Sequence, residues 1–151
     1  MPARCLSRPR GVPLAVRGYP PPVSDALVIN ESDVERETWS DSVRGEVSFR
    51  TIFGAQPTTT PEFTAGVTEL APGAVLRHHR HKPAELYYVL EGEGTLAIDG
   101  EEHAVLAGTA AYIPGNSEHG IRNTGAAPLR FFYTFAVASF DQIDYHFTAE
   151  Q

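Results

Sequence analysis

The chain has 151 residues, 42% of them hydrophobic and 10% aromatic, which suits one globular domain with a buried core. A formal charge of −7 argues against a nucleic-acid partner, because phosphate binding draws on clustered lysine and arginine. No apolar run reaches the length of about 18 residues that a membrane span needs. The single cysteine, Cys5, excludes an internal disulfide framework and favours a cytoplasmic location.

Residues 1–24 are rich in proline and arginine. They contain half of the twelve prolines, four arginines and no acidic residue. Such a composition cannot assemble a core and predicts a disordered tail. An export signal is the alternative, but the apolar run at 14–16 is too short for its hydrophobic region. We therefore expect a single folded domain over residues 25–151.

The first half of that domain shows strand patterns. Apolar and polar residues alternate over 43–53, which predicts a half-buried strand. A short apolar run at 26–29 is interpreted as an edge strand, whereas 32–38 is polar with little periodicity. Threonine and proline at 55–61 indicate a loop, and 63–70 is expected to form a further strand.

The stretch 73–92 contains two histidines and a glutamate at strand spacing. His79 and His81 are two residues apart, so on a strand both imidazoles point to the same face. The Lys-Pro-Ala sequence at 82–84 predicts a bend, because proline removes a backbone donor and restricts its neighbour. The next strand can then return the Glu85 carboxylate to the same point. Two imidazoles and a carboxylate are ligands for a divalent metal ion.

The rest of the chain reads as short strands joined by turns. Asp-Gly at 99–100 is a strong hairpin signal. The remaining strands are expected at 95–98, 101–106, 109–113, 119–123 and 129–137. About nine or ten short strands without a convincing helix predict an all-β antiparallel barrel or jelly roll.

A second motif stretch, 108–123, places His119 just after a proline-glycine turn. Together with 73–92 it resembles the paired motifs of the cupin superfamily. The matching positions are Gly73, His79, His81, Glu85 and Gly92 in the first motif and Gly108, Pro114, His119 and Asn123 in the second. Asn116 stands where the family usually has glycine, and asparagine tolerates positive φ, so we expect the turn to be kept. The resemblance implies a cupin double-stranded β-helix (a jelly-roll barrel).

The resemblance also implies that one divalent transition metal is bound by four residues: His79, His81, Glu85 and His119. Three imidazoles and one carboxylate leave open positions on an octahedral ion. Fe(II) or Mn(II) is favoured, and Ni(II), Co(II) and Zn(II) are alternatives.

The remaining histidines are expected to be non-ligands. Strand alternation places His78 on the opposite face from His79, and His103 and His146 lie outside both motifs. Arg77 shares the parity of His79, so it is either a cavity residue that grips an anionic group or a solvated strand end.

Tyr87 lies two residues after Glu85 and shares its strand face. A free phenol is a poor base at neutral pH, but a nearby dication favours the phenolate. Tyr87 is therefore a candidate catalytic base, and the alternative is a tyrosine that only packs and donates one hydrogen bond. Tyr112, Tyr133 and Phe131 are further candidates for the cavity wall.

The opposite face of the same strand carries Leu86, Tyr88 and Leu90. An antiparallel strand with one wet face should carry polar residues there, so something is expected to cover this face. Another layer of the same chain is one possibility. A second subunit is favoured, which predicts a homodimer.

The segment 79–92, HRHKPAELYYVLEG, resembles the small single-domain dimethylsulfoniopropionate lyases. That resemblance implies a small carboxylate substrate, a metal that polarises its carboxylate, and catalytic roles for Tyr87 and Glu85. Dimethyl sulfide would leave by β-elimination and acrylate would remain. Residues 43–47 and 119–123 are also similar to polyketide-cyclase cupins. A cupin dioxygenase or a non-catalytic metal- or ligand-binding cupin would carry the same set of metal ligands.

Overall fold

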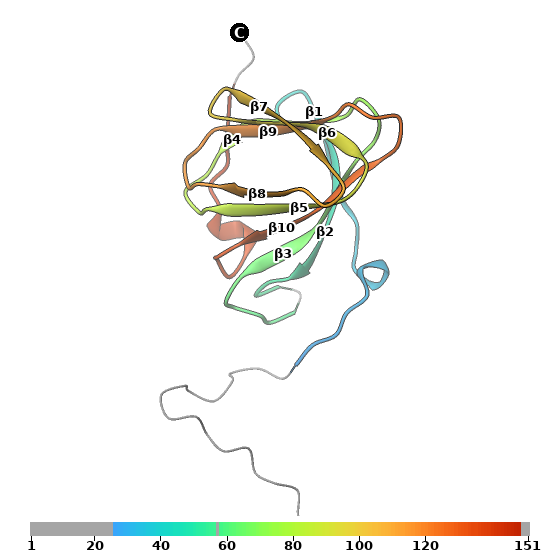
Figure 1. The fold of residues 1–151 in the computed structure, drawn as a ribbon. Helices are drawn as coiled ribbons and strands as arrows, with labels where there is room; N and C mark the ends of the chain where they lie inside the picture. Colours follow the sequence, from blue (N-terminus) through green and yellow to red (C-terminus); the bar gives the residue numbers. More distant parts are fainter. Residues whose placement is uncertain (1–25, 57, 149–151) are drawn as a thin grey trace, which may run out of the picture.

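The computed structural model describes residues 26–56 and 58–148 of the chain, so the tail expected at 1–24 lies outside the described residues. Almost all regular structure in the described part is β-strand (Figure 1). The elements are η1 Glu31–Asp33, β1 Glu37–Asp41, β2 Gly45–Phe53, β3 Thr64–Leu70, β4 Val75–Arg80, β5 Glu85–Glu91, β6 Glu93–Ile98, β7 Glu101–Leu106, β8 Ala110–Ile113, β9 His119–Asn123, β10 Leu129–Phe135, η2 Phe140–Gln142 and β11 His146–Phe147. The all-β prediction is confirmed.

The strands form one antiparallel sheet of eleven strands that curls on itself. Its order is β7-β6-β9-β4-β2-β3-β10-β5-β8, with β1 added to β2 and β11 added to β4. Figure 1 shows β7, β6, β9 and β4 in one layer, opposite β8, β5, β10 and β3 in the other. This is the expected jelly-roll barrel. The described helices, η1 and η2, are single turns of three residues, too short to cross a membrane.

The core fills the space between the two layers. Its fully buried apolar side chains come from both, and include Leu70, Leu96, Ile113, Ile121, Leu129, Phe131 and Phe135. Each such side chain contributes about 1.5–3 kcal/mol relative to an exposed one. On β5 the buried positions alternate with exposed ones, as predicted: Glu85, Tyr87 and Val89 point inward.

Two turns keep the conformations that their residues favour. Asp99 and Gly100 both have positive φ (49° and 85°), which closes the hairpin between β6 and β7. Asn116 also has positive φ (66°), as predicted for the turn before β9. Its backbone N–H donates to the His81 carbonyl at 2.8 Å, so this turn is tied directly to the first histidine motif.

The N-terminal part of the domain corrects the sequence interpretation. No strand forms at 26–29, where Val28 is 99% exposed. Instead β1 begins at the end of the polar stretch 32–38 and continues beyond it, and its Trp39 pairs with Val47 of β2. Val43 lies outside β2 in the connecting turn, which the Asp41 carboxylate holds by accepting two backbone N–H groups. Pairing with β2 therefore decided where the strand is, rather than local apolar content.

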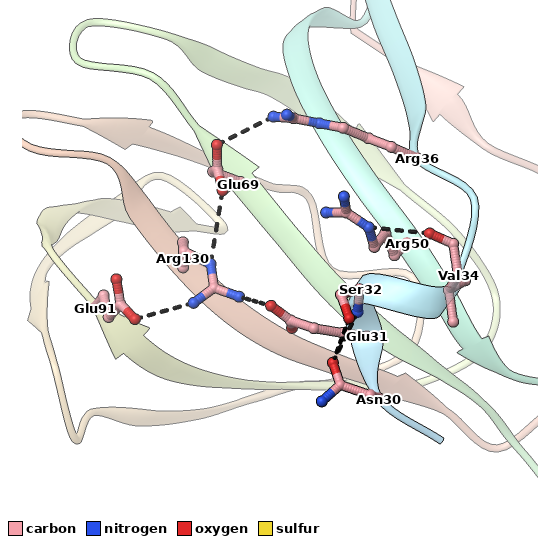
Figure 2. A network of polar contacts seen from close by, with 9 residues as sticks. All are labelled: Asn30, Glu31, Ser32, Val34, Arg36, Arg50, Glu69, Glu91 and Arg130. Atoms are coloured by element: carbon pink, nitrogen blue, oxygen red, sulfur yellow. Dashed lines mark hydrogen bonds and ion pairs between the residues drawn. The ribbon is translucent and has the colours of Figure 1, made fainter.

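The segment that leads into β1 is held on the outside of the barrel by ion pairs (Figure 2). Arg130 of β10 pairs with Glu31 of η1, with Glu91 at 3.0 Å and with Glu69 at 3.6 Å. The Glu69 carboxylate also accepts from Arg36 at 3.0 Å. Such exposed pairs contribute about 0–1 kcal/mol each, so they orient the segment more than they stabilise the fold.

Candidate metal centre

The ends of three strands, β4, β5 and β9, bring the four predicted ligands together inside the barrel. His79 on β4 is the register partner of His119 at the start of β9, so their side chains are cross-strand neighbours. His81 follows the end of β4, and Glu85 begins β5 after the predicted bend. One ligand atom from each of the four residues lies within 4.8 Å of the others, and all four residues are buried.

The three imidazoles are held by the same kind of hydrogen bond. Each Nδ1 lies close to a backbone carbonyl: His79 to Arg77 at 2.7 Å, His81 to Pro83 at 2.9 Å and His119 to Ser117 at 3.0 Å. A carbonyl oxygen only accepts, so each Nδ1 carries the proton and donates it. The Nε2 atom of each ring is then directed to the common point. Such outer hydrogen bonds are those that orient metal-binding histidines.

The Glu85 carboxylate lies next to two of the three imidazoles. Its Oε2 lies 3.1 Å from Nε2 of His119 and 3.3 Å from Nε2 of His81. Burial by itself raises the pKa of Glu85, but the hydrogen bonds from His119 and His81 outweigh burial, and the pKa is lowered. Burial lowers the pKa of His79 to about 3, with the nearby His119 as second cause. At neutral pH the centre thus offers a carboxylate and a neutral imidazole at His79.

This buried cluster of three histidines and one glutamate is compatible with a divalent metal ion. The donors are the nitrogen and oxygen types that first-row transition metals accept, and the Nδ1 hydrogen bonds leave each Nε2 atom facing the other ligand atoms.

The remaining candidates near the motif point elsewhere. His78 is half exposed on the outer face, where it faces Glu118 at 3.6 Å, as expected for a non-ligand. Arg77 does not line the cavity that holds His79 and Glu85. The register shifts between Leu76 and His79 along β4, and the half-buried Arg77 lines a separate groove with His78 and Thr95. The cavity interpretation of Arg77, which assumed an unbroken strand, is therefore wrong.

Tyr87 lines the same cavity as Glu85 and His79. Its ring packs 4.4 Å from the ring of Phe131, centroid to centroid. Burial, and then the charge of Glu85, raise the pKa of Tyr87 well above its usual value of 10 in the absence of a metal. Phe131 and Tyr133 also line the cavity, whereas Tyr112 is 68% exposed on the outer surface.

Further cavity residues come from segments whose sequence carries no functional motif. Trp39 of β1, Phe49 of β2, Phe140 of η2 and Tyr145 before β11 close one side of the cavity. The Tyr145 ring lies 5.4 Å from His79 and 5.3 Å from His81. Composition was the one sign that could have found them: a single tryptophan in a polar stretch and a cluster of aromatic residues near the C-terminus.

Comparison with known proteins agrees with this architecture. Residues 66–135 match the cupin domain family. The chain is 42% identical over 149 residues to dimethylsulfoniopropionate lyase DddW of Ruegeria pomeroyi, and the match covers 97% of this chain and 90% of that protein. The chain belongs to the cupin family.

More distant cupins match at lower identity. The oxalate-binding protein of Thermotoga maritima is 27% identical over 70% of this chain and 89% of its own length. The structure of the polyketide cyclase RemF from Streptomyces resistomycificus superposes with a TM-score of 0.70 at 23% identity, covering 83% of this cupin and 89% of that chain. The structural likeness to RemF concerns the fold.

Proposed function

We propose that this cupin is a metal-dependent carbon-sulfur lyase that cleaves dimethylsulfoniopropionate to dimethyl sulfide and acrylate. The observation that carries the proposal is the 42% identity with a dimethylsulfoniopropionate lyase along nearly the whole of both chains. The buried cluster of three imidazoles and one carboxylate, with the Tyr87 phenol in the cavity beside His79 and Glu85, agrees with it.

In this proposal, His79, His81, Glu85 and His119 hold one divalent ion, with Fe(II) or Mn(II) favoured. A bound ion of this kind supplies Lewis-acid polarisation of the substrate carboxylate. The chain's own contribution is to orient three imidazoles through their Nδ1 hydrogen bonds and to hold the four ligands in a buried site.

Tyr87 takes the proton in this proposal. Its phenolate oxygen accepts a proton from the carbon next to the substrate carboxylate, and that electron pair forms the new carbon-carbon double bond. The bond between sulfur and the β-carbon breaks, its electrons stay on sulfur, and dimethyl sulfide leaves with acrylate as the second product. Because the metal-free site raises the pKa of Tyr87, the phenolate requires the neighbouring dication.

The decisive experiment is headspace gas chromatography for dimethyl sulfide. Purified protein is loaded separately with Fe(II), Mn(II), Ni(II), Co(II) and Zn(II) and given dimethylsulfoniopropionate without oxygen. We expect sulfide with at least one metal and none with His81→Ala. Protein with full metal content that releases no sulfide would contradict the lyase proposal, and oxygen consumption or ring closure would then be assayed.

We further propose a homodimer formed through the outer face of β5, β8 and β10. Leu86, Tyr88 and Leu90 remain partly exposed there, and no described segment of the chain covers them. Leu86 lies beside Tyr112 of β8, so the apolar face continues across strands. Contiguous apolar patches of this kind mark interaction sites. A cytoplasmic location, expected from the single cysteine, stays a prediction.

A further inference from the structure

The metal cavity is separated from an outer groove by four aromatic side chains. The cavity is about 30 Å³ and is lined by His79, Glu85 and Tyr87 among others, whereas the groove outside is about 1000 Å³. The residues that line both spaces are Trp39, Phe49, Phe140 and Tyr145, here called the aromatic gate. A cavity of this size has room for about two water molecules. A larger substrate therefore reaches the histidines only when gate side chains move.

The rings of the aromatic gate form a closed circuit. Neighbouring ring centroids are separated by 5.2 Å for Trp39 and Phe49, 5.9 Å for Phe49 and Phe140, 6.5 Å for Phe140 and Tyr145, and 5.6 Å for Tyr145 and Trp39. A group at the middle of this circuit lies within about 6 Å of every centroid, which is the range of a cation–π interaction. Neutral apolar groups gain no such attraction.

The charges around the gate have the sign that a cation requires. Among the described residues that line the groove, Asp33, Glu35, Glu37 and Asp141 are acidic, and none is lysine or arginine. On the cavity side the nearest charge is the buried Glu85 carboxylate. The Trp39 ring already holds one cation, the Arg44 guanidinium at 5.1 Å, whose charge is balanced by Asp41 at 2.7 Å.

We propose that the groove is the access route to the metal cavity and that the aromatic gate selects a small organic cation, a sulfonium or quaternary ammonium group. This inference rests on the proposed function for the other end of the ligand, a carboxylate directed to the histidines. The gate is half buried between solvent and cavity, because Trp39, Phe140 and Tyr145 are partly exposed while Phe49 is buried. The acidic groove raises the local concentration of cations.

The binding test compares two ligands of the same shape. These are 3-(trimethylammonio)propanoate and its uncharged carbon analogue, 4,4-dimethylpentanoate. Trp39 is the single tryptophan of the chain, so its fluorescence in Mn(II)-loaded protein reports on the gate directly. We expect the cationic ligand to bind about tenfold more tightly, which corresponds to about 1.4 kcal/mol and lies within the range of cation–π energies. Equal affinities would overturn the proposal.

Gate variants show whether the rings produce this preference. In Tyr145→Leu the affinity ratio measured by calorimetry should fall towards one, while Tyr145→Phe, which keeps the ring, should retain it. Phe140→Leu is the second variant if Tyr145→Leu unfolds, as judged by thermal melting. An unchanged ratio in a folded leucine variant contradicts the role of the rings.

The access route is tested by association kinetics. Glu35→Gln combined with Glu37→Gln should slow binding of the cationic ligand and flatten its salt dependence, relative to Glu101→Gln combined with Glu102→Gln on β7. Equal rates in the two double variants overturn the route. These tests measure binding and need no turnover, so their outcome is independent of the lyase proposal. Cation selectivity without dimethyl sulfide release contradicts the lyase alone, and release without selectivity contradicts the gate alone.

Discussion

The metal-free protein should lose stability as the pH falls below 6.5, because His79 is buried as a neutral imidazole. Burial lowers the pKa of His79 to about 3, whereas in the unfolded chain its pKa is near the ordinary 6.5. Between these values the unfolded state binds a proton that the folded state does not. The stabilising contribution is therefore complete above pH 6.5 and is lost as the pH falls towards 3.

The size of this effect follows from the difference in pKa. One proton changes the free energy of unfolding by about 1.4 kcal/mol per pH unit, so the whole interval amounts to at most about 5 kcal/mol. Glu85 acts in the same direction at lower pH, because its lowered pKa makes a contribution that is lost below its ordinary value of 4.5. Such a loss is a large part of the usual stability of a domain.

Urea unfolding in the presence of a chelator, at half-unit steps from pH 7.5 to pH 4, measures this contribution. His79→Gln removes the titrating group and should flatten the slope by about 1.4 kcal/mol per pH unit below pH 6.5. His78→Gln is the matched control, because His78 is half exposed on the opposite face and should leave the slope unchanged. Equal slopes in the wild type and His79→Gln would refute the reasoning.

Three more predictions concern the site, the fold and the assembly. Tyr87→Phe should retain the metal, measured by plasma mass spectrometry, but reduce dimethyl sulfide release by at least about 100-fold, the usual contribution of a general base; near-normal release would exclude Tyr87 as the base. Gly45→Ala should lower the free energy of unfolding by at least about 2 kcal/mol, because at φ +99° its Cβ would lie 1.9 Å from the Val75 carbonyl oxygen. Gly100→Ala is the control, because Gly100 also has positive φ but an added Cβ would meet no atom within 4 Å. If denaturant titration gave a similar loss of stability for Gly100→Ala, the clash of the Gly45→Ala Cβ with Val75 would be unimportant. If the proposed dimer forms through the outer face of β5, β8 and β10, Tyr88→Lys should give a monomer in light scattering, whereas Val43→Lys, at a position that is 58% exposed in a turn, should not change the oligomeric state.

Sequence reasoning succeeded where a feature depends on neighbouring residues. The alternation on β5, the positive φ at Asp99-Gly100 and the kept turn at Asn116 all follow from local backbone chemistry. The spacing of His79, His81 and Glu85 also sufficed to predict that their side chains meet, because strand parity and a proline bend are short-range properties.

Tertiary pairing decided the features that have no local signal. The bulge on β4 arises in its pairing with β9, and Arg77 lines a separate groove although its parity with His79 also allowed a place in the cavity. Strand β1 exists because β2 offers it an edge, in a stretch whose composition predicted no strand. The aromatic gate contains Trp39 and Tyr145, which are far apart in sequence. Their rings meet because β11, which follows Tyr145, pairs with β4. Local sequence determined which residues form the candidate metal centre, and long-range packing decided what surrounds it.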